Sequence, residues 1–346
     1  MERINLSSIK KESVKAIFGA ITGKDHISRA EIAEITGLSL MTVGKVVDAF
    51  LERKVVIQSK EVKNAAGRRA GLVRLNTDKF FLILDVTSKN MSMVVMDIAL
   101  NIVDRISYEY NPEFYYDENL YIFMKNVKIY TLRNLKMENS IGIGVVLPGN
   151  YVPEKDIIDE TRIPEQASTH IKSIIENVLR YPVDALEKDV LMAAASNLAD
   201  LRQEELRSVV YVGIGETISG VLLCDGRILN GRNAYAGDIG KMMTDSGRSL
   251  CDLFAERGLR EDTLYAITTA IAYEILLLDP NIVLIENCTD QKLGRFREIL
   301  EKRVCSLCGI TADKLPDIRL LETGIRHAYR GIAIHMRSEW IQKTTE

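Results

Sequence analysis

The chain has 346 residues, which is long enough for two or three domains that each bury a hydrophobic core. Apolar residues make up 47% and charged residues 27%, an ordinary mixture for a soluble globular protein. This composition excludes a disordered chain, a collagen-like fibre and a disulfide-rich miniprotein, and the net charge of −3 by itself indicates no particular partner.

No apolar run reaches the roughly 18 residues that a membrane-spanning helix needs. The longest candidate, residues 266–278, is interrupted by Glu274, and the first residues lack the apolar stretch of a signal peptide. We therefore expect a cytoplasmic protein with no membrane partner. Its five cysteines, an odd number, are expected to stay reduced.

The charge is unevenly distributed along the chain. Residues 1–75 contain 14 Lys and Arg against 8 Asp and Glu, whereas the remainder contains 31 against 40. A basic head on an acidic body suggests that the head binds a polyanion.

The head has the pattern of a helix-turn-helix. Residues 9–21 carry apolar side chains at helical spacing, and Ser28 with Glu31 forms a capping box that predicts the start of a second helix. Gly37 ends that helix, and Ser39 is expected to cap a third. The inward stripe of the third helix is Val43, Val46, Val47, Phe50 and Leu51.

In a helix-turn-helix the second of the paired helices enters the major groove of double-stranded DNA. We therefore predict DNA contacts from residues at the starts and on the outward face of these helices, namely Arg29, Ser39, Met41, Thr42 and Lys45. The alternative is a small helical bundle whose outward face is simply solvated.

A wing is predicted after the three helices. Residues 55–59 and 71–75 have strand patterns, and the loop between them carries Arg68 and Arg69. Such a loop suits contact with the DNA backbone or the narrow minor groove, although a solvated hairpin tip is the alternative. Residues 1–76 are therefore predicted to form a winged helix-turn-helix domain.

The body shows one α/β order twice. Strands are expected at 80–86, 91–98, 102–110 and 141–147 with a helix at 119–135, and then strands at 209–214, 218–224, 282–285 and 318–321 with helices at 263–278, 291–303 and 325–342. This repetition predicts two related α/β lobes with a cleft between them, 77–184 plus 325–346 and 185–324.

Head, wing and body together resemble the ROK family of repressors, open reading frames and sugar kinases, and more narrowly its winged-helix repressors, such as the xylose and N-acetylglucosamine repressors. The most specific stretches are 28–56, 67–76, 141–149, 225–241 and 278–284. The resemblance implies a two-lobed actin/hexokinase-like, ribonuclease H-like body. It also implies a DNA-binding head that a carbohydrate-binding body controls.

The kinase phosphate turns are altered. The family kinases carry Asp-Ile-Gly-Gly-Thr where this chain has Asp85-Val-Thr-Ser-Lys89, so Thr87 and Ser88 replace glycines that allow close backbone approach. Their second turn, Gly-Thr-Gly-Ile-Gly, matches Gly215-Glu-Thr-Ile-Ser219, and Glu216 places a negative charge where phosphates would lie. We therefore expect no ATP binding, no catalytic residue and no enzyme activity.

The sugar and zinc signature also departs from the family. The catalytic Asn-Asp pair aligns with Lys188-Asp189, and Gly-Glu-Ile-Gly-His aligns with Gly237-Asp-Ile-Gly-Lys241. Because the histidine is missing and Cys251 alone represents the cysteine-rich zinc loop, no zinc or other metal cofactor is expected. The Cys305-x-x-Cys308 pair has no second pair, and we interpret it as packing thiols.

The predicted ligand-binding residues are Gly149, Lys188, Asp189, Asp238 and Lys241. Two added ammonium groups suggest an anionic effector, a phosphorylated or acidic sugar. The alternatives are that each lysine pairs internally with Asp189 or Asp238, leaving no ligand site, and that Asp189 only caps a helix.

These observations favour a transcription regulator, a repressor of carbohydrate metabolism that acts as a homodimer or tetramer on a two-fold operator. A sugar or sugar-phosphate effector would shift the population of DNA-competent arrangements. Two alternatives stay open, an active ATP-dependent sugar kinase and a ligand-independent DNA-binding scaffold.

Overall fold

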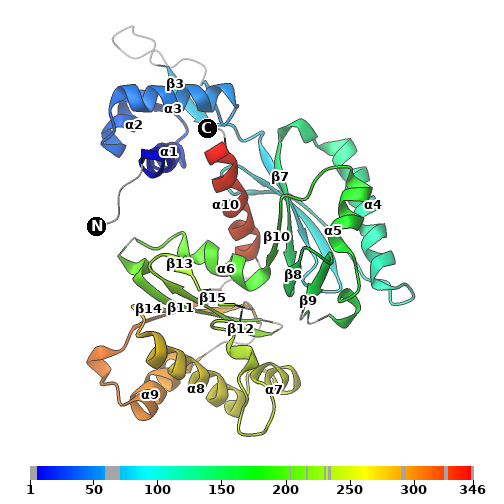
Figure 1. Cartoon of the computed structure of the whole chain (residues 1–346), viewed down its shortest axis with the longest axis vertical. Helices are drawn as coiled ribbons and strands as arrows, with labels where there is room; N and C mark the ends of the chain where they lie inside the picture. Colours follow the sequence, from blue (N-terminus) through cyan, green and yellow to red (C-terminus); the bar gives the residue numbers. More distant parts are fainter. Residues whose placement is uncertain are drawn as a thin grey trace. The chain divides into compact units, whose positions relative to one another are not determined.

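The computed structural model describes residues 6–58, 71–159, 161, 163–202, 204–215, 217–229, 231–232, 235–289, 294–322 and 326–343. Its contacts divide the chain into two compact units, Met1–Leu186 with Ile332–Glu346 (unit 1) and Glu187–Gly331 (unit 2). The chain passes from unit 1 to unit 2 in strand β10 (Ala185–Lys188) and returns within helix α10 (Arg326–Lys343) (Figure 1).

Unit 1 begins with three helices and a small sheet. The helices are α1 (Leu6–Ile21), α2 (Arg29–Thr36) and α3 (Leu40–Glu52), and the antiparallel sheet has the order β1 (Ile27–Ser28), β3 (Leu72–Leu75), β2 (Val56–Gln58). The capping box of Ser28 and Glu31 is present, and Gly37 ends α2 at φ 67°. Ser39 caps α3 through the Thr42 amide, so the predicted starts of the second and third helices are confirmed. The first helix begins at Leu6, three residues before the predicted Ile9.

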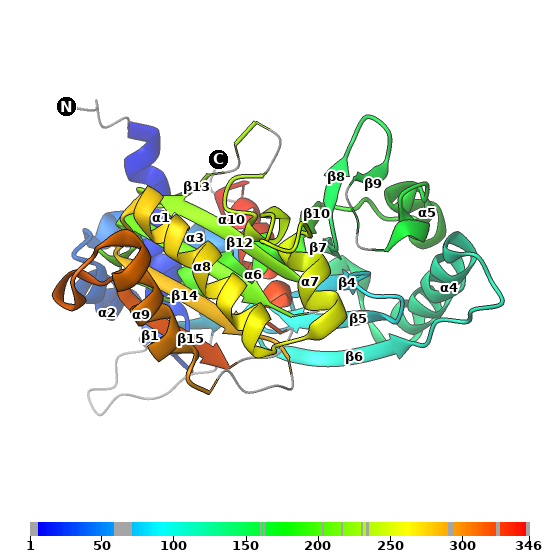
Figure 2. The ribbon, with the colours of Figure 1, turned by 90° about the horizontal axis from the view of Figure 1, so that it is seen from below.

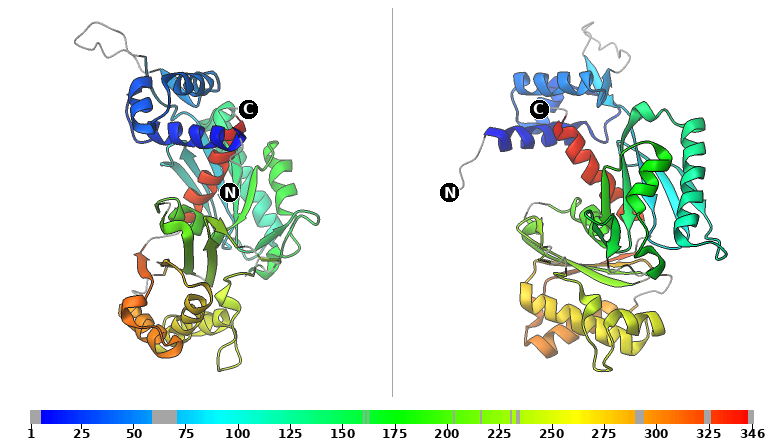
Figure 3. Two further views of the ribbon diagram at one scale, coloured as in Figure 1. Left: turned by 60° about the vertical axis from the view of Figure 1, so that its left-hand side comes forward. Right: turned by 45° about the vertical axis from the view of Figure 1, so that its right-hand side comes forward.

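The core of the head is closed by a segment from the far end of the chain. Ile17, Val47 and Phe50 are fully buried, and they share one cluster with Trp340 and Ile341 of α10. The C-terminal end of α10 accordingly lies beside the head in both views of Figure 3. Sequence periodicity predicted the helix but not this contact.

The rest of unit 1 is a five-stranded sheet with the order β10-β7-β4-β5-β6. Its long strands are β4 (Phe80–Asp85), β5 (Met91–Asp97), β6 (Ile102–Tyr108) and β7 (Ser140–Leu147), and β4 pairs antiparallel with β5 and parallel with β7. Helices α4 (Tyr116–Asn134) and α5 (Ile171–Leu179) share a core with one face. Ile332 and Met336 of α10 lie against Gly144 of β7 on the other face.

Smaller elements complete unit 1. They are the hairpin β8 (Asn150–Val152) and β9 (Ile157–Asp159) and the short 3-10 helices η1 (Met137–Asn139) and η2 (Pro164–Gln166). The hairpin and α5 were not predicted, because their strands and helix are shorter than the windows in which periodicity is clear.

Unit 2 repeats the strand arrangement. Its sheet has the order β13-β12-β11-β14-β15, formed by β11 (Ser208–Ile214), β12 (Ile218–Cys224), β13 (Arg227–Ile228), β14 (Ile282–Asn287) and β15 (Asp317–Glu322). Strand β11 pairs antiparallel with β12 and parallel with β14. The fold class predicted for the body, α/β with two related sheets, is therefore confirmed.

Helices cover both faces of this second sheet. Val210, Val212 and Ile214 share a core with α8 (Glu261–Leu278), α9 (Phe296–Cys308) and α7 (Leu250–Arg257), which lie over one face in Figure 2. The alternate residues Val209 and Tyr211 pack with α6 (Asp189–Leu198). The remaining short 3-10 helices are η3 (Glu205–Arg207), η4 (Ile239–Lys241) and η5 (Ala312–Lys314).

One predicted helix has different bounds. The helix expected over 291–303 runs from Phe296 to Cys308, and residues 290–293 lie outside the described part. Gly294, at φ 44°, has a left-handed backbone that a right-handed helix cannot continue through. The helix extends beyond Arg303 because Val304 is buried and the Cys308 thiol donates to the Ala272 carbonyl, and Gly309 ends it at φ 66°.

We predict that Gly331→Ala lowers the free energy of unfolding by about 1–3 kcal/mol, the usual cost of overpacking. A Cβ at Gly331 would lie 1.8 Å from the Met192 carbonyl oxygen of α6, so the backbone of one helix must move. The measurement is the urea midpoint followed by circular dichroism.

Gly19→Ala in α1 is the matched control, because a Cβ there meets nothing within 4 Å. This change should raise the stability by about 0.5–1 kcal/mol through helix propensity. Equal stability of Gly331→Ala and the unmodified chain would contradict the close packing of α10 on α6.

Candidate functional site

The start of α3 presents a mixed apolar and basic surface. Leu40 and Met41 are 61% and 72% exposed, Lys45 is also exposed, and Thr42 is half-buried. Ser39 is committed to the cap, since its hydroxyl accepts from the Thr42 amide at 3.1 Å and lies 2.9 Å from the Thr42 hydroxyl. The side chains free to reach outward from this turn are therefore Leu40, Met41 and Lys45, and Leu40 was not among the predicted contacts.

Arg29 has a defined partner in the head. Its guanidinium donates to the Asp48 carboxylate at 2.5 Å, with both side chains more than a third exposed. This ion pair links the first residue of α2 to the outward face of α3. The other two predicted contacts, Arg68 and Arg69, lie outside the described residues.

Helix α10 holds the head from behind. The Arg337 guanidinium lies 5.0 Å from the centre of the Phe18 ring and donates to the Ile98 carbonyl at 2.9 Å. One side chain thus connects α1, the end of β5 and α10. No sequence signal marked Arg337, since its partners are hundreds of residues away.

The turn that would hold a phosphate is closed by its own side chains. The Asp85 carboxylate accepts from the Thr87 amide at 2.9 Å and from the Thr87 hydroxyl at 2.6 Å. The Ser88 hydroxyl donates to the Asn90 carbonyl at 2.6 Å. Thr87 and Ser88, the residues expected to stand at the kinase glycine positions, therefore stabilise the turn internally.

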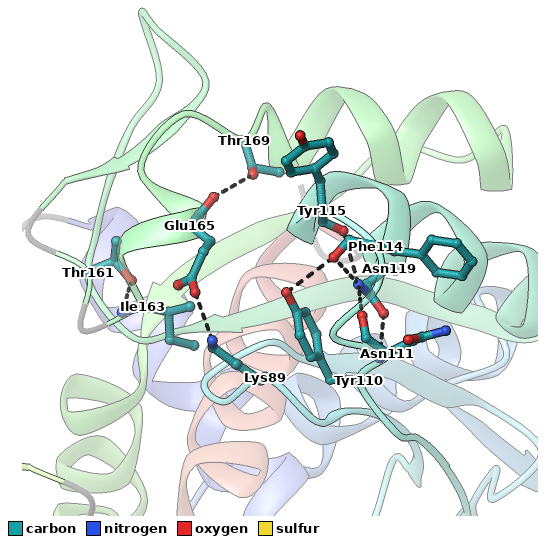
Figure 4. A network of polar contacts seen from close by, with 10 residues as sticks. All are labelled: Lys89, Tyr110, Asn111, Phe114, Tyr115, Asn119, Thr161, Ile163, Glu165 and Thr169. Atoms are coloured by element: carbon teal, nitrogen blue, oxygen red, sulfur yellow. Dashed lines mark hydrogen bonds and ion pairs between the residues drawn. The ribbon is translucent and has the colours of Figure 1, made fainter.

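Lys89 ends this turn and is held to a neighbouring segment (Figure 4). Its ammonium donates to the Glu165 carboxylate at 2.7 Å, which raises the lysine pKa and lowers that of the glutamate. The same ammonium lies 5.3 Å from the centre of the Tyr110 ring, and the Tyr110 hydroxyl donates to the Phe114 carbonyl. These contacts tie the turn to the segments before α4 and in η2.

Gly149 of unit 1 has a structural reason to be glycine. A Cβ there would lie 2.6 Å from the Asp159 carbonyl oxygen and 2.8 Å from an Ile158 methyl group. The residue lets the hairpin β8–β9 fold back against the strand end. It is the single predicted ligand residue in unit 1, since the other four belong to unit 2.

In unit 2 the structure brings Lys188 and Asp238 together. The ammonium and carboxylate are 3.6 Å apart, and the side chains are only 17% and 11% exposed. The Ser219 hydroxyl donates to the other oxygen of Asp238 at 3.2 Å. This geometry matches the alternative in which Lys188 pairs internally.

The other two predicted residues have separate surroundings. Asp189 is the first residue of α6, and its carboxylate accepts from the Val190 amide at 2.8 Å. Lys241 is exposed and its ammonium lies 4.6 Å from the centre of the Tyr235 ring. A carboxylate at a helix start is favoured by the helix dipole, as the alternative interpretation of Asp189 requires.

A buried acidic network lies at the end of β14, and sequence analysis did not find it. Glu286 is 1% exposed, and its carboxylate accepts from the Tyr211 hydroxyl and from the Asn197 amide, the latter at 3.0 Å. Burial, with the nearby Glu286, raises the pKa of the Tyr211 hydroxyl, and raises that of the Cys288 thiol to about 12. Asp189 adds to both shifts, so two carboxylates share this region. The only sequence signal is an acid at the end of an apolar strand.

The described cysteines are free thiols. Cys251 donates to the Ile218 carbonyl at 3.0 Å, and burial raises its pKa. Cys305 and Cys308 are free thiols in the last turn of α9. Within the described ranges, no three His, Cys, Asp or Glu side chains are placed to hold a metal ion, and no helix has the length and hydrophobicity to cross a membrane.

Comparison with known proteins identifies the family. Residues 84–256 match the ROK family model, and the chain belongs to the ROK family. A xylose repressor of Bacillus spizizenii is 23% identical over 278 residues, which are 78% of this chain and 70% of that protein.

Two solved structures share the fold. A ROK family transcriptional regulator, a homolog of the E. coli MLC protein, has a TM-score of 0.72 at 14% identity and covers 97% of this chain and 98% of its own. A ROK hexokinase from Thermus thermophilus has a TM-score of 0.55 at 18% identity and covers 74% of this chain and 97% of its own. The regulator therefore matches nearly the whole chain, whereas the kinase matches about three quarters of it.

We predict that Lys188→Met lowers the stability of the ligand-free protein by about 1–3 kcal/mol, because it leaves the Asp238 carboxylate buried without its cation. Lys241→Met is the control, since an exposed cation–π contact contributes only about 0.5–1 kcal/mol. Both are measured by chemical denaturation. An unchanged stability of Lys188→Met would show that Lys188 is available to an anionic ligand.

Proposed function

We propose that this protein is a DNA-binding transcriptional regulator, a repressor of carbohydrate metabolism, whose kinase-like body binds an effector without phosphorylating it. The observation that carries the proposal is the pair of capped helices α2 and α3, whose exposed helix start is apolar and basic, in a chain that belongs to the ROK family. The similarity to xylose repressors over most of the chain supports it.

The chemistry of the α3 surface suits the major groove. Leu40 and Met41 offer apolar contact to thymine methyl groups, and Lys45 can reach a guanine edge or a phosphate. Asp48 on the outward side of α3 forms an ion pair with Arg29. The negative charge of Asp48 is therefore compensated when the helix approaches the polyanion.

The phosphate-binding regions support a body without kinase activity. The turn after β4 is filled by the bonds from Thr87 to Asp85. Kinase catalysis depends on close positioning of the phosphates, and the side chains of Thr87 and Ser88 stand where the family kinases have glycine. The alternative of an active sugar kinase is accordingly the weaker one.

We propose a sugar or sugar phosphate as the effector, bound through Asp189, Asp238 and Lys241. Carboxylates accept hydrogen bonds from sugar hydroxyls, and Lys241 adds a cation on an exposed arm. Because Lys188 and Asp238 form an ion pair, this part of the surface carries less net positive charge than two free lysines would.

We predict that Lys45→Ala weakens binding to a duplex selected from a random DNA library and lowers the slope of affinity against salt by about one ion. Arg68→Ala with Arg69→Ala should weaken binding to all sequences, as expected for backbone contacts. Gel-shift titrations at several salt concentrations measure both effects.

Lys125→Ala on α4 is the charge-matched control for the DNA experiment, because it removes one lysine outside the head. A loss of affinity in this control as large as that in Lys45→Ala would attribute binding to overall charge. No selected duplex at all would reject the proposed function.

We predict that a sugar or sugar phosphate raises the melting temperature while no sugar is phosphorylated in the presence of ATP. A thermal-shift screen of pentoses, hexoses and their phosphates, with a coupled assay for ADP, measures both. ADP formation that Asp189→Asn abolishes would establish the kinase alternative. No shift with any sugar would favour the ligand-independent scaffold.

A further inference from the structure

The ion pair of Arg29 and Asp48 lies on the surface that we propose to face DNA. Arg29 is the first residue of α2, and Asp48 lies on α3 two turns after Leu40. One terminal guanidinium nitrogen donates to one carboxylate oxygen at 2.5 Å. Because the two side chains are 38% and 64% exposed, water screens the pair and its contribution to folding is small. A role in binding therefore explains its position better than a role in stability.

Gly44 leaves room on α3 for the Arg29 side chain. Glycine inside a helix is unfavourable, because it gains freedom in the unfolded chain. A Cβ at Gly44 would lie 3.8 Å from the other terminal nitrogen of the Arg29 guanidinium. Since Gly44 and Asp48 are four residues apart, they lie on the same side of the helix, one turn from each other. The guanidinium therefore lies across the outward side of α3, from Gly44 to Asp48.

Most hydrogen-bond donors of Arg29 are unused. A guanidinium has five N–H groups. Asp48 accepts one of them, and the part of the chain that the structure describes provides Arg29 with no other hydrogen bond or ion pair. The planar fork fits two neighbouring acceptors, such as two oxygens of one phosphate or O6 and N7 of one guanine. Both kinds of acceptor pair are present on double-stranded DNA.

Glu52 shows what an acid on the same helix looks like without such a partner. It is the last residue of α3, one turn after Asp48, and its side chain is exposed. Among the described residues it forms no ion pair. The two acids thus differ in one respect that matters here, since only Asp48 fixes the position of an arginine.

We propose that Asp48 determines the DNA specificity of the head by positioning Arg29. The carboxylate holds the guanidinium across α3, and the remaining donors bind a pair of acceptors in the complex with the preferred DNA sequence. The inference rests on the proposed function and adds a residue that acts through another. An arginine that is ordered before binding loses less conformational freedom when the complex forms, and this gain is realised only where the acceptors match its position.

Removal of Asp48 has two effects of opposite sign. An acid near DNA repels phosphates whatever the sequence, so its removal strengthens binding to every duplex alike. Loss of the Arg29 position, by contrast, weakens only the complex in which Arg29 meets its acceptors. The ratio of the affinities for a preferred and an unrelated duplex cancels the first effect and measures the second.

The test is a double-mutant cycle on Arg29 and Asp48. Gel-shift titrations measure the affinity for the duplex selected from the random library and for an unrelated duplex of equal length. We expect Asp48→Ala to lower the ratio of the two affinities by about threefold to tenfold, the effect of ordering one side chain on binding. In the Arg29→Ala background the same change should leave the ratio unaltered. Asp48→Asn, which keeps the shape and removes the charge, is a second variant, and circular dichroism checks that all are folded.

Glu52→Ala is the charge-matched control, and it should strengthen binding to both duplexes equally. Single base-pair changes in the selected duplex identify the acceptors of Arg29. Arg29→Ala relaxes the preference at one G·C pair if the acceptors belong to a guanine, whereas it weakens all duplexes and lowers the salt slope if they belong to a phosphate.

An unchanged ratio in a folded Asp48→Ala variant would overturn the proposal, as would an equal fall of the ratio with and without Arg29. In either case the unmodified chain still prefers its selected duplex, so the proposed function stands. If the unmodified chain selects no duplex at all, the proposed function fails and this inference fails with it.

Discussion

The structure of unit 1 depends on the packing of α10. Ile332 and Met336 lie against Gly144 of the sheet, and Trp340 and Ile341 enter the core of the helix-turn-helix further along the same helix. A close-packed core fixes the elements that share it. The helices α2 and α3, which we propose to read DNA, therefore pack on the C-terminal helix, and the head belongs to unit 1 by its contacts.

The first turn of α10 belongs to unit 2, which gives the helix a second set of contacts. Arg330 donates to the Asp200 carboxylate at 2.7 Å and to the Ser196 carbonyl, and Gly331 lies against the Met192 carbonyl. These partners are in or next to α6, the helix that begins at Asp189. The helix that ends beside the head therefore begins in contact with α6.

Local chemistry made the head predictable, and distance along the chain hid its support. The capping box at Ser28, the left-handed Gly37 and the Ser39 cap are each encoded within four residues, so the sequence specified α2 and α3 closely. The contact of Arg337 with Phe18 joins residues that no local pattern connects. The pairing of Lys188 with Asp238 was foreseen as one of two alternatives, because opposite charges were expected nearby but their geometry depends on the fold.

The glycines of the body separate what the fold needs from what phosphate chemistry needs. A Cβ at Gly240 would lie 2.1 Å from the Ile218 carbonyl oxygen, and one at Gly149 would lie 2.6 Å from that of Asp159, so both residues are required by backbone contacts within their own unit. No such contact requires glycine at the turn after β4, where Thr87 bonds to Asp85. Gly149 and Gly240 are thus explained by packing within their own units, whereas the turn after β4 is stabilised by side-chain hydrogen bonds that a glycine could not make.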